Sequence, residues 1–333
     1  MFFDRPGYLY FVIFEKRFKM ILPELADIQA AHSRIRPFIH WTPVMSSKQL
    51  NAIFGCELFF KCENFQKVGA FKFRGATNAV LSLSSDEKSK GVVTHSSGNH
   101  AAALALAARM NGVKANIVMP DNAPVVKKNA VAGYGAEITF CKPTLQAREE
   151  ATRIIMNKTG ATLVHPYDNY NVICGQGTAA LELLNEKSDL EIIIAPVGGG
   201  GLMSGTSTCV KGIDNRIQVI GAEPLNADDA YKSFNSGTIV PSVNPLTIAD
   251  GLLTSLSELT FAIIRKNVDK IFTAREETII ECMLLVWERM KIVIGPSSAT
   301  VLAIVKENPD FFRGKKTGLI ISGGNVDFRK LPF

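Results

Sequence analysis

The sequence predicts an α/β protein made of two doubly wound domains. Short apolar runs alternate with amphipathic stretches along most of the chain, a pattern typical of βαβ units with parallel strands. The candidate strands are too many for one open sheet, and 333 residues fit about two domains at roughly 150 residues each. Because 47% of the residues are hydrophobic and 20% are charged, the composition excludes a mainly disordered chain.

The candidate elements follow from this alternation. Strands are expected where short apolar runs are bounded by turn residues, at 57–61, 91–94, 115–119, 137–140, 162–164, 191–196, 218–222, 270–273 and 317–321. Helices are expected in the amphipathic stretches between them, at 23–35, 73–83, 99–111, 124–133, 144–158, 177–186, 202–211, 228–236, 276–291 and 298–306. The strands between 91 and 168 form one group of four. We therefore expect a small domain at 91–168, inserted into a large domain formed by 20–90 and 169–333.

Residues 1–19 are expected to form an extension outside the fold. Gly7 to Phe14 is apolar and aromatic, and the charges of Glu15, Lys16 and Arg17 follow it. A signal peptide places its charge before the apolar core, so this order is wrong for one. Met20 directly precedes a good helix start, which indicates an upstream start; a targeting or membrane-surface element is the alternative.

The net charge and the cysteine spacing indicate which partners the protein binds and in which compartment it lies. The 37 Lys and Arg residues exceed the 31 Asp and Glu residues by 6, without a long basic run, so we expect anionic small molecules and no nucleic acid. No apolar run reaches the ~18 residues of a spanning helix, so we expect no membrane partner. The six cysteines form no CxxC pair, which favours buried free thiols in the reducing cytoplasm over disulfides or zinc.

Three candidate strand ends carry glycine together with serine or further glycine, at 94–100, 195–201 and 321–325. In open α/β sheets, ligands bind at the carboxyl ends of strands. Four consecutive glycines, Gly198 to Gly201, would present bare backbone N–H groups at a helix N-terminus, which suits a phosphate. A tight strand–helix turn is the alternative, and a dinucleotide site stays open because Glu223 follows at a suitable distance.

Lys72 is the candidate nucleophile. Its neighbours Phe71 and Phe73 would desolvate the ammonium and lower its pKa, as a Schiff-base lysine requires. Taken alone, a lysine in this pattern favours a surface residue. Together with a phosphate loop and a serine–glycine loop, it indicates pyridoxal phosphate (PLP).

The motif around Lys72 is one of several ordered segments: KCENFQ at 61–66, GAFKFRGA at 69–76, SSGNH at 96–100, HP at 165–166, GQGT at 175–178, AEP at 222–224, IADG at 248–251, WERMK at 287–291 and SGGN at 322–325. In this order they resemble the serine racemase and threonine/serine dehydratase family of fold-type II PLP enzymes. The resemblance extends from about residue 22 to residue 327. It implies the tryptophan synthase β-like architecture and a homodimer.

The resemblance implies how the cofactor would be held. Lys72 carries PLP as a Schiff base and acts as the base on one face of the substrate α-carbon, while Phe71 packs on the ring. Ser322 faces the pyridine nitrogen, and its neutral hydroxyl would make the cofactor a weaker electron sink than an aspartate would. Asn99 bonds the ring hydroxyl, and the phosphate is held by Gly198, Gly199, Gly200, Gly201 and Leu202.

The resemblance also implies substrate contacts. Ser96, Ser97 and Asn99 lie at a helix N-terminus, where a substrate carboxylate is favoured. Ser97 is the proton donor on the face that Lys72 does not serve. Arg148 matches a family arginine that reaches the substrate from the small domain, and a solvated helix charge is the alternative.

A divalent-cation site is implied at Glu223, Asp229 and the carbonyl of Ala227. Two carboxylates and a backbone oxygen suit Mg²⁺, Ca²⁺ or Mn²⁺. An acidic helix N-terminus that caps without metal is the alternative. The resemblance implies that none of the histidines at 95, 100 and 165 is the proton carrier of the reaction, so we expect each to order its loop.

Two departures from the family pattern stand out. Gly295 occupies the position of a glutamate that the family places near the cofactor ring. Tyr134, Lys291 and Asn325 match a nucleotide site, but Ala102 and Val68 replace its usual glutamine and threonine. Whether ATP acts as an effector therefore stays open.

These expectations lead to a PLP-dependent enzyme that interconverts L- and D-serine and also converts serine to pyruvate and ammonia. A threonine/serine or threo-3-hydroxyaspartate dehydratase (ammonia-lyase) on the same scaffold is the first alternative. A PLP-binding protein with impaired turnover is the second, and only Gly295 supports it.

Overall fold

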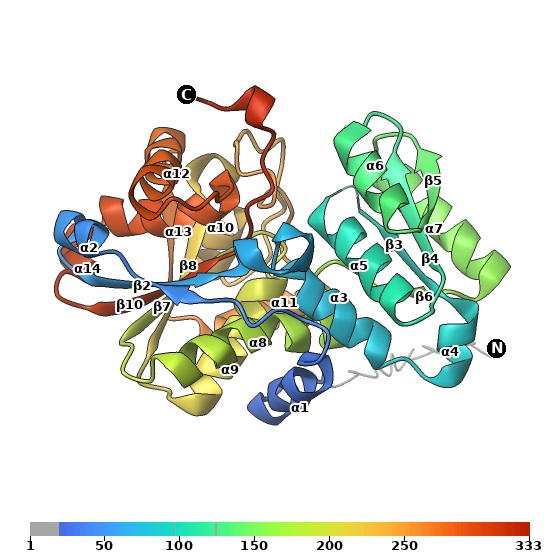
Figure 1. The fold of residues 1–333 in the computed structure, drawn as a ribbon, viewed down its shortest axis with the longest axis horizontal. Coiled ribbons are helices and arrows are strands. Elements are labelled where there is room, and N and C mark those ends of the chain that lie inside the picture. Colours follow the sequence, from blue (N-terminus) through green and yellow to red (C-terminus); the bar gives the residue numbers. More distant parts are fainter. Residues whose placement is uncertain (1–19, 97, 124) are drawn as a thin grey trace, which may run out of the picture.

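The computed structural model describes residues 20–96, 98–123 and 125–333, and it contains two β-sheets (Figure 1). The larger sheet has six strands in the order β1-β2-β10-β7-β8-β9, and the smaller has four in the order β5-β4-β3-β6. All neighbouring strands are parallel except β1 and β2. The α/β class with parallel sheets, predicted from the sequence, is confirmed.

The strands lie close to the expected positions. In the larger sheet they are β1 Val44–Met45, β2 Glu57–Cys62, β7 Ile192–Pro196, β8 Gln218–Pro224, β9 Lys270–Ala274 and β10 Lys316–Ile321. In the smaller sheet they are β3 Val92–His95, β4 Ala115–Pro120, β5 Glu137–Cys141 and β6 Thr162–Leu163. All four strands of the smaller sheet fall between 91 and 168, while the domain boundaries themselves stay a prediction.

Helices cover both faces of the larger sheet. One face packs on α2 Lys48–Phe54, α12 Glu276–Met290, α13 Pro296–Glu307 and α14 Pro309–Phe312. The opposite face packs on α1 Leu25–Ile35, α8 Tyr170–Glu186, α9 Gly201–Ile213, α10 Asp229–Ser236 and α11 Glu258–Asn267. Both faces are therefore buried, as a parallel sheet requires.

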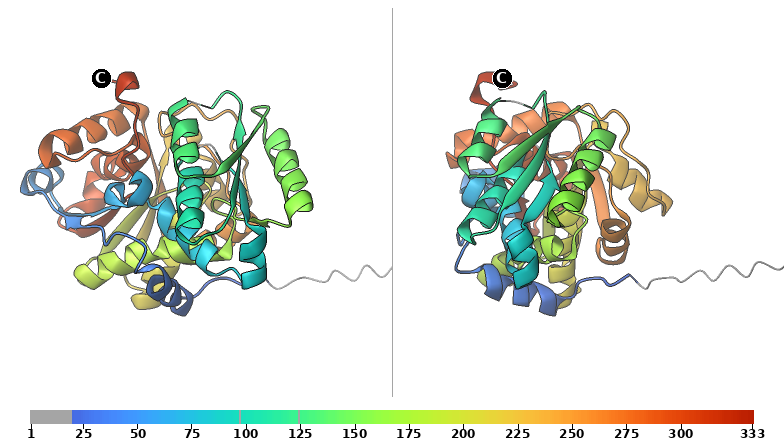
Figure 2. Two further views of the ribbon diagram at one scale, coloured as in Figure 1. Left: turned by 45° about the vertical axis from the view of Figure 1, so that its right-hand side comes forward. Right: turned by 90° about the vertical axis from the view of Figure 1, so that its right-hand side faces the viewer.

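Helices also cover both faces of the smaller sheet, as Figure 2 shows. The helices that follow or precede its strands are α3 Lys72–Leu81, α4 Ser85–Lys90, α5 Asn99–Met110, α6 Val125–Gly133 and α7 Leu145–Thr159. α3 and α5 pack together over one face, and α7 packs on the other. Four 3₁₀ turns complete the elements: η1 Glu63–Phe65, η2 Lys67–Gly69, η3 Leu225–Ala227 and η4 Phe328–Lys330.

The strand register brings the carboxyl ends of β2, β10, β7 and β8 to one edge of the larger sheet. Ile321 of β10 pairs with Cys62 of β2, and Pro196 of β7 pairs with Ala222 of β8. The segments that follow these strands therefore lie beside one another, and they hold most of the predicted site residues.

The sequence predicted free, buried cysteines and no membrane-spanning helix. The six cysteines are free, and all but Cys141 are buried. Within the described ranges, no helix is both long and apolar enough to cross a membrane. The extension at 1–19 and Ser97 lie outside the described residues.

Candidate active site

Lys72 is the first residue of α3, and its ammonium is buried although the residue as a whole is partly exposed. Its Nζ donates to the carbonyl oxygen of Pro166 at 2.8 Å and lies 5.0 Å from the centroid of the Phe71 ring. Burial lowers the pKa of Lys72 from 10.5 to about 8, because the charged form loses hydration that an aromatic ring and one carbonyl do not replace. Such a lysine is a competent nucleophile toward an aldehyde.

The glycine loop lies between β7 and α9, as predicted. Gly198 to Gly201 are buried, and Gly200 has φ +84° at the start of α9, where a side chain would be strained. Among the residues that the structure describes, the backbone amides from Gly198 to Leu202 donate to no protein acceptor. Buried N–H groups need an acceptor, and a phosphate at the start of α9 would supply it.

Tyr167 links Lys72 to the glycine loop. A Cβ on Gly199 would lie 2.3 Å from the Tyr167 ring, and one on Gly201 would lie 2.9 Å from its Cβ. The preceding residue, Pro166, is the one that accepts from Lys72. The lysine and the loop therefore face the same space, and glycine is required at 199 because the ring occupies the volume of a side chain.

Ser322 follows β10 and is buried near the lysine segment. Its carbonyl accepts from the Phe71 amide at 3.0 Å, and its hydroxyl lies 3.0 Å from that of Ser298. The Ser298 hydroxyl also bonds the backbone of Gly323, as acceptor at 2.8 Å and as donor at 2.7 Å. The hydroxyl of Ser322 is thus held in place, with a neutral partner rather than a charged one.

Asn99 opens α5, and its Oδ1 accepts from Nδ2 of Asn325 at 2.9 Å. Ser96 lies just before it, and its Oγ accepts from the Gly98 amide at 3.4 Å. Arg148 lies in α7, where its Nε donates to the Thr144 carbonyl at 3.4 Å. Both interpretations of Arg148, as a substrate contact and as a solvated helix charge, therefore stay predictions.

Two of the three histidines are held neutral by burial. Burial lowers the pKa of His100 to about 3 and that of His165 to about 4. A ring nitrogen of His100 lies 2.9 Å from the Val164 carbonyl, and Nδ1 of His165 accepts from the Asp168 amide at 2.9 Å. These contacts fit the expectation that the histidines order loops.

The candidate cation site lies where β8 meets α10. Glu223 accepts from the amides of Ala230 at 2.9 Å and Tyr231 at 2.7 Å, whereas neither buried oxygen of Asp229 meets a well-aligned donor among the described residues. Burial raises the pKa of Asp229 from 3.8 to about 6 and that of Glu223 well above 4.5. A cavity of about 250 Å³ adjoins Asp229 and Ala227. Among the described residues, the nearby Lys232 forms its ion pair with Asp228, and neither Glu223 nor Asp229 has an ion-pair partner of its own. Two such buried carboxylates fit a hard divalent cation.

The residues matched to a nucleotide site are spread over three segments. Tyr134 follows α6, Lys291 ends α12 with φ +58°, and Asn325 follows β10. Asn325 already uses its side-chain amide within the chain, and within the described part no hydrogen bond or ion pair joins the three. ATP as an effector stays a prediction.

Gly295 precedes α13 and is buried, with φ −85°. This backbone conformation suits any residue, so glycine is not required here. A Cβ at this position would approach nothing closer than 3.5 Å, the distance to Val326. The structure therefore accommodates the first atom of a larger side chain at residue 295.

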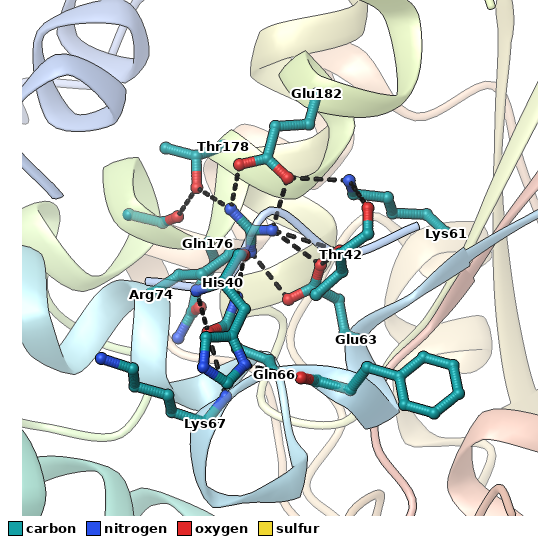
Figure 3. Close-up of polar contacts among 12 residues, drawn as sticks. His40, Thr42, Lys61, Glu63, Gln66, Lys67, Arg74, Gln176, Thr178 and Glu182 are labelled. Carbon is teal, nitrogen blue, oxygen red and sulfur yellow. Dashed lines mark hydrogen bonds and ion pairs between the residues drawn. The ribbon is translucent and has the colours of Figure 1, made fainter. Parts of the chain in front are cut away.

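A buried ionic network behind the lysine was missed from the sequence. Arg74 lies between the carboxylates of Glu63 and Glu182, and Lys61 contacts Oε2 of Glu182 at 2.7 Å, the same oxygen that Nη2 of Arg74 contacts (Figure 3). All four side chains have 0% exposure. The sequence does contain one indication of this network. Lys61 and Glu63 flank Cys62 at the end of an apolar run, and charged residues buried at such a place require partners of opposite charge.

The five N–H groups of Arg74 are all used. They reach both oxygens of Glu63 at 2.7 and 2.8 Å, both oxygens of Glu182 at 2.8 and 2.7 Å, and Thr178 at 3.2 Å. Arg74 stands two residues after Lys72, Glu63 opens the loop before it, and Glu182 is in α8. The network therefore fixes three elements around the lysine.

An α/β chain with a buried lysine of lowered pKa beside a loop of free amides defines a pyridoxal phosphate-dependent enzyme. Residues 35–323 match the family of pyridoxal-phosphate dependent enzymes, and the chain belongs to it.

Several known proteins are similar to this chain over almost its whole length. A serine racemase of Dictyostelium discoideum is 52% identical over 311 residues, which cover 92% of this chain and 96% of that protein. A beta-hydroxyaspartate dehydratase of Paracoccus denitrificans is 48% identical, with 94% and 100% covered. A crystal structure of a D. discoideum serine racemase superposes with a TM-score of 0.89 at 53% identity, covering 92% of this chain and 99% of that one.

Proposed function

We propose that this chain is a PLP-dependent serine racemase that also eliminates water from serine to give pyruvate and ammonia. The observation that carries the proposal is Lys72, buried at a pKa of about 8 and linked through Pro166 and Tyr167 to the free amides of the glycine loop. The similarity to serine racemases over more than nine tenths of the chain supports the substrate.

Different residues would bind the phosphate, the ring hydroxyl, the ring nitrogen and the ring face of the cofactor. When bound, PLP supplies an electron sink that makes the α-proton of an amino acid removable. The amides of Gly198, Gly199, Gly200, Gly201 and Leu202 would hold its phosphate, Asn99 its ring hydroxyl and Ser322 its ring nitrogen. Phe71, whose ring lies beside the Lys72 ammonium, would pack on the ring face.

Two proton carriers are needed for racemisation, one on each side of the α-carbon. Lys72 would take and return the proton on its own side, since a pKa of about 8 allows both protonation states near neutral pH. Ser97, outside the described residues, is proposed on the other side. Ser96 and Asn99, at the start of α5, would bind the substrate carboxylate, and Arg148 would approach it from α7.

A divalent cation, Mg²⁺ or alternatively Ca²⁺ or Mn²⁺, is proposed at Glu223, Asp229 and the Ala227 carbonyl. The support is the pair of oxygens on Asp229, which are buried without a well-aligned donor in the described chain. We further propose a homodimer in the cytoplasm; the free, mostly buried cysteines fit a reducing compartment.

Elimination from a hydroxyaspartate is the second candidate. It is favoured by the Paracoccus dehydratase, which is 48% identical over 94% of this chain. Both reactions begin with removal of the same α-proton, so one site could serve either substrate.

The experiment is incubation of the purified protein with L-serine, L-threonine or threo-3-hydroxyaspartate, followed by chiral separation of the amino acids and assay of the keto acids. D-serine together with pyruvate supports the proposal. Turnover of hydroxyaspartate alone, with serine untouched, would make the second candidate the function.

A further inference from the structure

The segment after β10 is paired with the segment that carries Lys72. The amide of Phe71 donates to the Ser322 carbonyl at 3.0 Å, and the amide of Gly324 donates to the Gly69 carbonyl at 3.0 Å. Ala70 and Gly323 form an antiparallel bridge between them. Residues 322–324 thus run antiparallel to 69–71, directly before the lysine.

The next position in this pairing is occupied by a side chain. Nδ2 of Asn325 donates to the carbonyl oxygen of Val68 at 2.7 Å, where a backbone amide would otherwise continue the ladder. A carbonyl can only accept, so the NH₂ of Asn325 must face Val68, which fixes the orientation of this amide. The Asn325 side chain also fills the space where a Cβ on Gly69 would be, at 2.5 Å from its Oδ1.

Val68 needs such support because its backbone is left-handed. It has φ +59° and ψ +13°, a conformation that β-branched residues rarely adopt. Gly69, at φ +68°, follows it. Two consecutive left-handed residues create the turn that leads into Lys72, and the surroundings must hold the first of them in place.

The second hydrogen of the Asn325 amide reaches another element. Nδ2 lies 2.9 Å from Oδ1 of Asn99, the first residue of α5. Because an amide oxygen accepts, this contact leaves the NH₂ of Asn99 as the group free to donate elsewhere. The single amide of Asn325 therefore touches both the turn before Lys72 and the start of α5.

We propose that Asn325 is a positioning residue for the cofactor. It holds the left-handed turn at Val68, and so the approach of Lys72, and it turns the NH₂ of Asn99 toward the ring hydroxyl. The inference rests on the proposed roles of Lys72 and Asn99. It assigns to Asn325 a function within the chain, separate from any nucleotide.

The test measures PLP binding to the apoprotein, with no turnover required. Loss of two hydrogen bonds in Asn325→Ala should raise the Kd for PLP about tenfold or more and shift the visible absorption of the bound cofactor. Asn64→Ala is the matched control, since its amide also donates to a backbone carbonyl, that of Val293 at 3.1 Å, and forms no hydrogen bond with Val68 or Asn99 among the described residues. This control should bind PLP within about twofold of the parent, because neither positioned group has changed.

A second pair of variants tests the route through Val68. Val68→Gly accepts the left-handed conformation without strain, so Asn325→Ala should raise the Kd less in that background than in the parent. Hydrogen exchange of the Phe71 amide in the apoprotein should also quicken in Asn325→Ala alone. An unchanged Kd and spectrum in Asn325→Ala would overturn the proposal, and an equal loss in both backgrounds would overturn the role assigned to the Val68 turn. Since neither readout uses serine, a failure of racemisation would leave the role of Asn325 standing.

Discussion

At Lys72, burial rather than a neighbouring charge determines the chemistry. Its ammonium meets a carbonyl oxygen and an aromatic ring, neither of which carries a formal charge. With a pKa of about 8, roughly one molecule in ten has a neutral lysine at pH 7. The same side chain can thus attack an aldehyde and later hold a proton.

The first prediction concerns this lysine. In the parent apoprotein, the rate of forming a borohydride-reducible link with PLP should rise with pH, with a midpoint near 8, as Lys72 loses its proton. Lys72→Ala should form no such link and turn over no serine. Absorbance and mass spectrometry after reduction measure both. A variant that retains the link at the same site would show that another lysine carries the cofactor.

Gly295 gives the second prediction. If the family's glutamate orients the cofactor ring, Gly295→Glu should raise kcat severalfold, because the backbone at φ −85° suits glutamate and its Cβ would make ordinary contacts, the nearest at 3.5 Å. Steady-state kinetics with L-serine measure this, and Gly295→Gln separates charge from size. An unchanged or lower kcat with PLP retained would mean that the family pattern does not transfer to this chain.

Among the elements, α8 shows how packing overrides sequence pattern. The predicted helix begins at 177, but α8 begins at Tyr170 and runs through Gly175 and Gly177. A Cβ on Gly175 would lie 2.6 Å from Gly75 of α3, and one on Gly177 would lie 2.7 Å from the Gly205 carbonyl of α9. These glycines permit close helix contacts rather than ending the helix, and a single sequence does not reveal that reason.

Short elements were also missed for a physical reason. β1 has two residues and shows no alternation, and α2, α4 and α14 are only 7, 6 and 4 residues long. Elements this short contain too few residues to show a periodic pattern of apolar positions. Their positions depend on capping and tertiary contacts instead, as in the capping box between Ser84 and Glu87 that begins α4.

The network that joins β2, α3 and α8 gives the third prediction. Arg74→Met removes the shared partner of the buried carboxylates of Glu63 and Glu182, so the free energy of unfolding should fall by about 3–5 kcal/mol. Urea unfolding measures it. Arg313→Met removes a pair that is 72% and 92% exposed and should change the value by no more than about 0.5 kcal/mol. Similar losses in both variants would contradict the role given to the network.

The turn between β8 and α10 gives the fourth prediction. Because the pKa of Asp229 is about 6 in the folded state and 3.8 ordinarily, the folded protein binds more protons in that window. Without a cation, stability therefore falls as the pH rises through it. A bound cation cancels this loss. EDTA should lower the Tm by at least ~3 °C at pH 7 and by less at pH 5.

Asp229→Asn provides the control for the cation. It removes the buried charge, so its Tm should no longer respond to EDTA or Mg²⁺, and it should exceed that of the chelated parent protein at pH 7. Thermal unfolding with and without each reagent measures this. Equal Tm values for the parent protein in EDTA, Mg²⁺ and Ca²⁺ would exclude a structural cation.

Across the whole molecule, the parts of the candidate site that the sequence could indicate lie in segments between a strand and the helix that follows it. Lys72 and the glycine loop were recognisable because an aromatic-flanked lysine and four glycines are unusual in themselves. Pro166 and Asn325 were not recognised as linking residues, since their contacts join segments 94 and 257 residues apart. Tyr167 was missed in the same way, because its contacts with Gly199 and Gly201 also join separate segments. Such contacts depend on the strand order β2-β10-β7, which local patterns do not contain.

The central claim is that this fold moves the α-proton of serine on both sides. The most direct test is incubation of the purified protein with L-serine in D₂O, with chiral chromatography and mass spectrometry of serine and a pyruvate assay. We expect D-serine carrying deuterium at Cα together with pyruvate, and from Ser97→Ala we expect pyruvate without D-serine. Pyruvate alone from the parent protein, or serine with no deuterium at Cα, would contradict it.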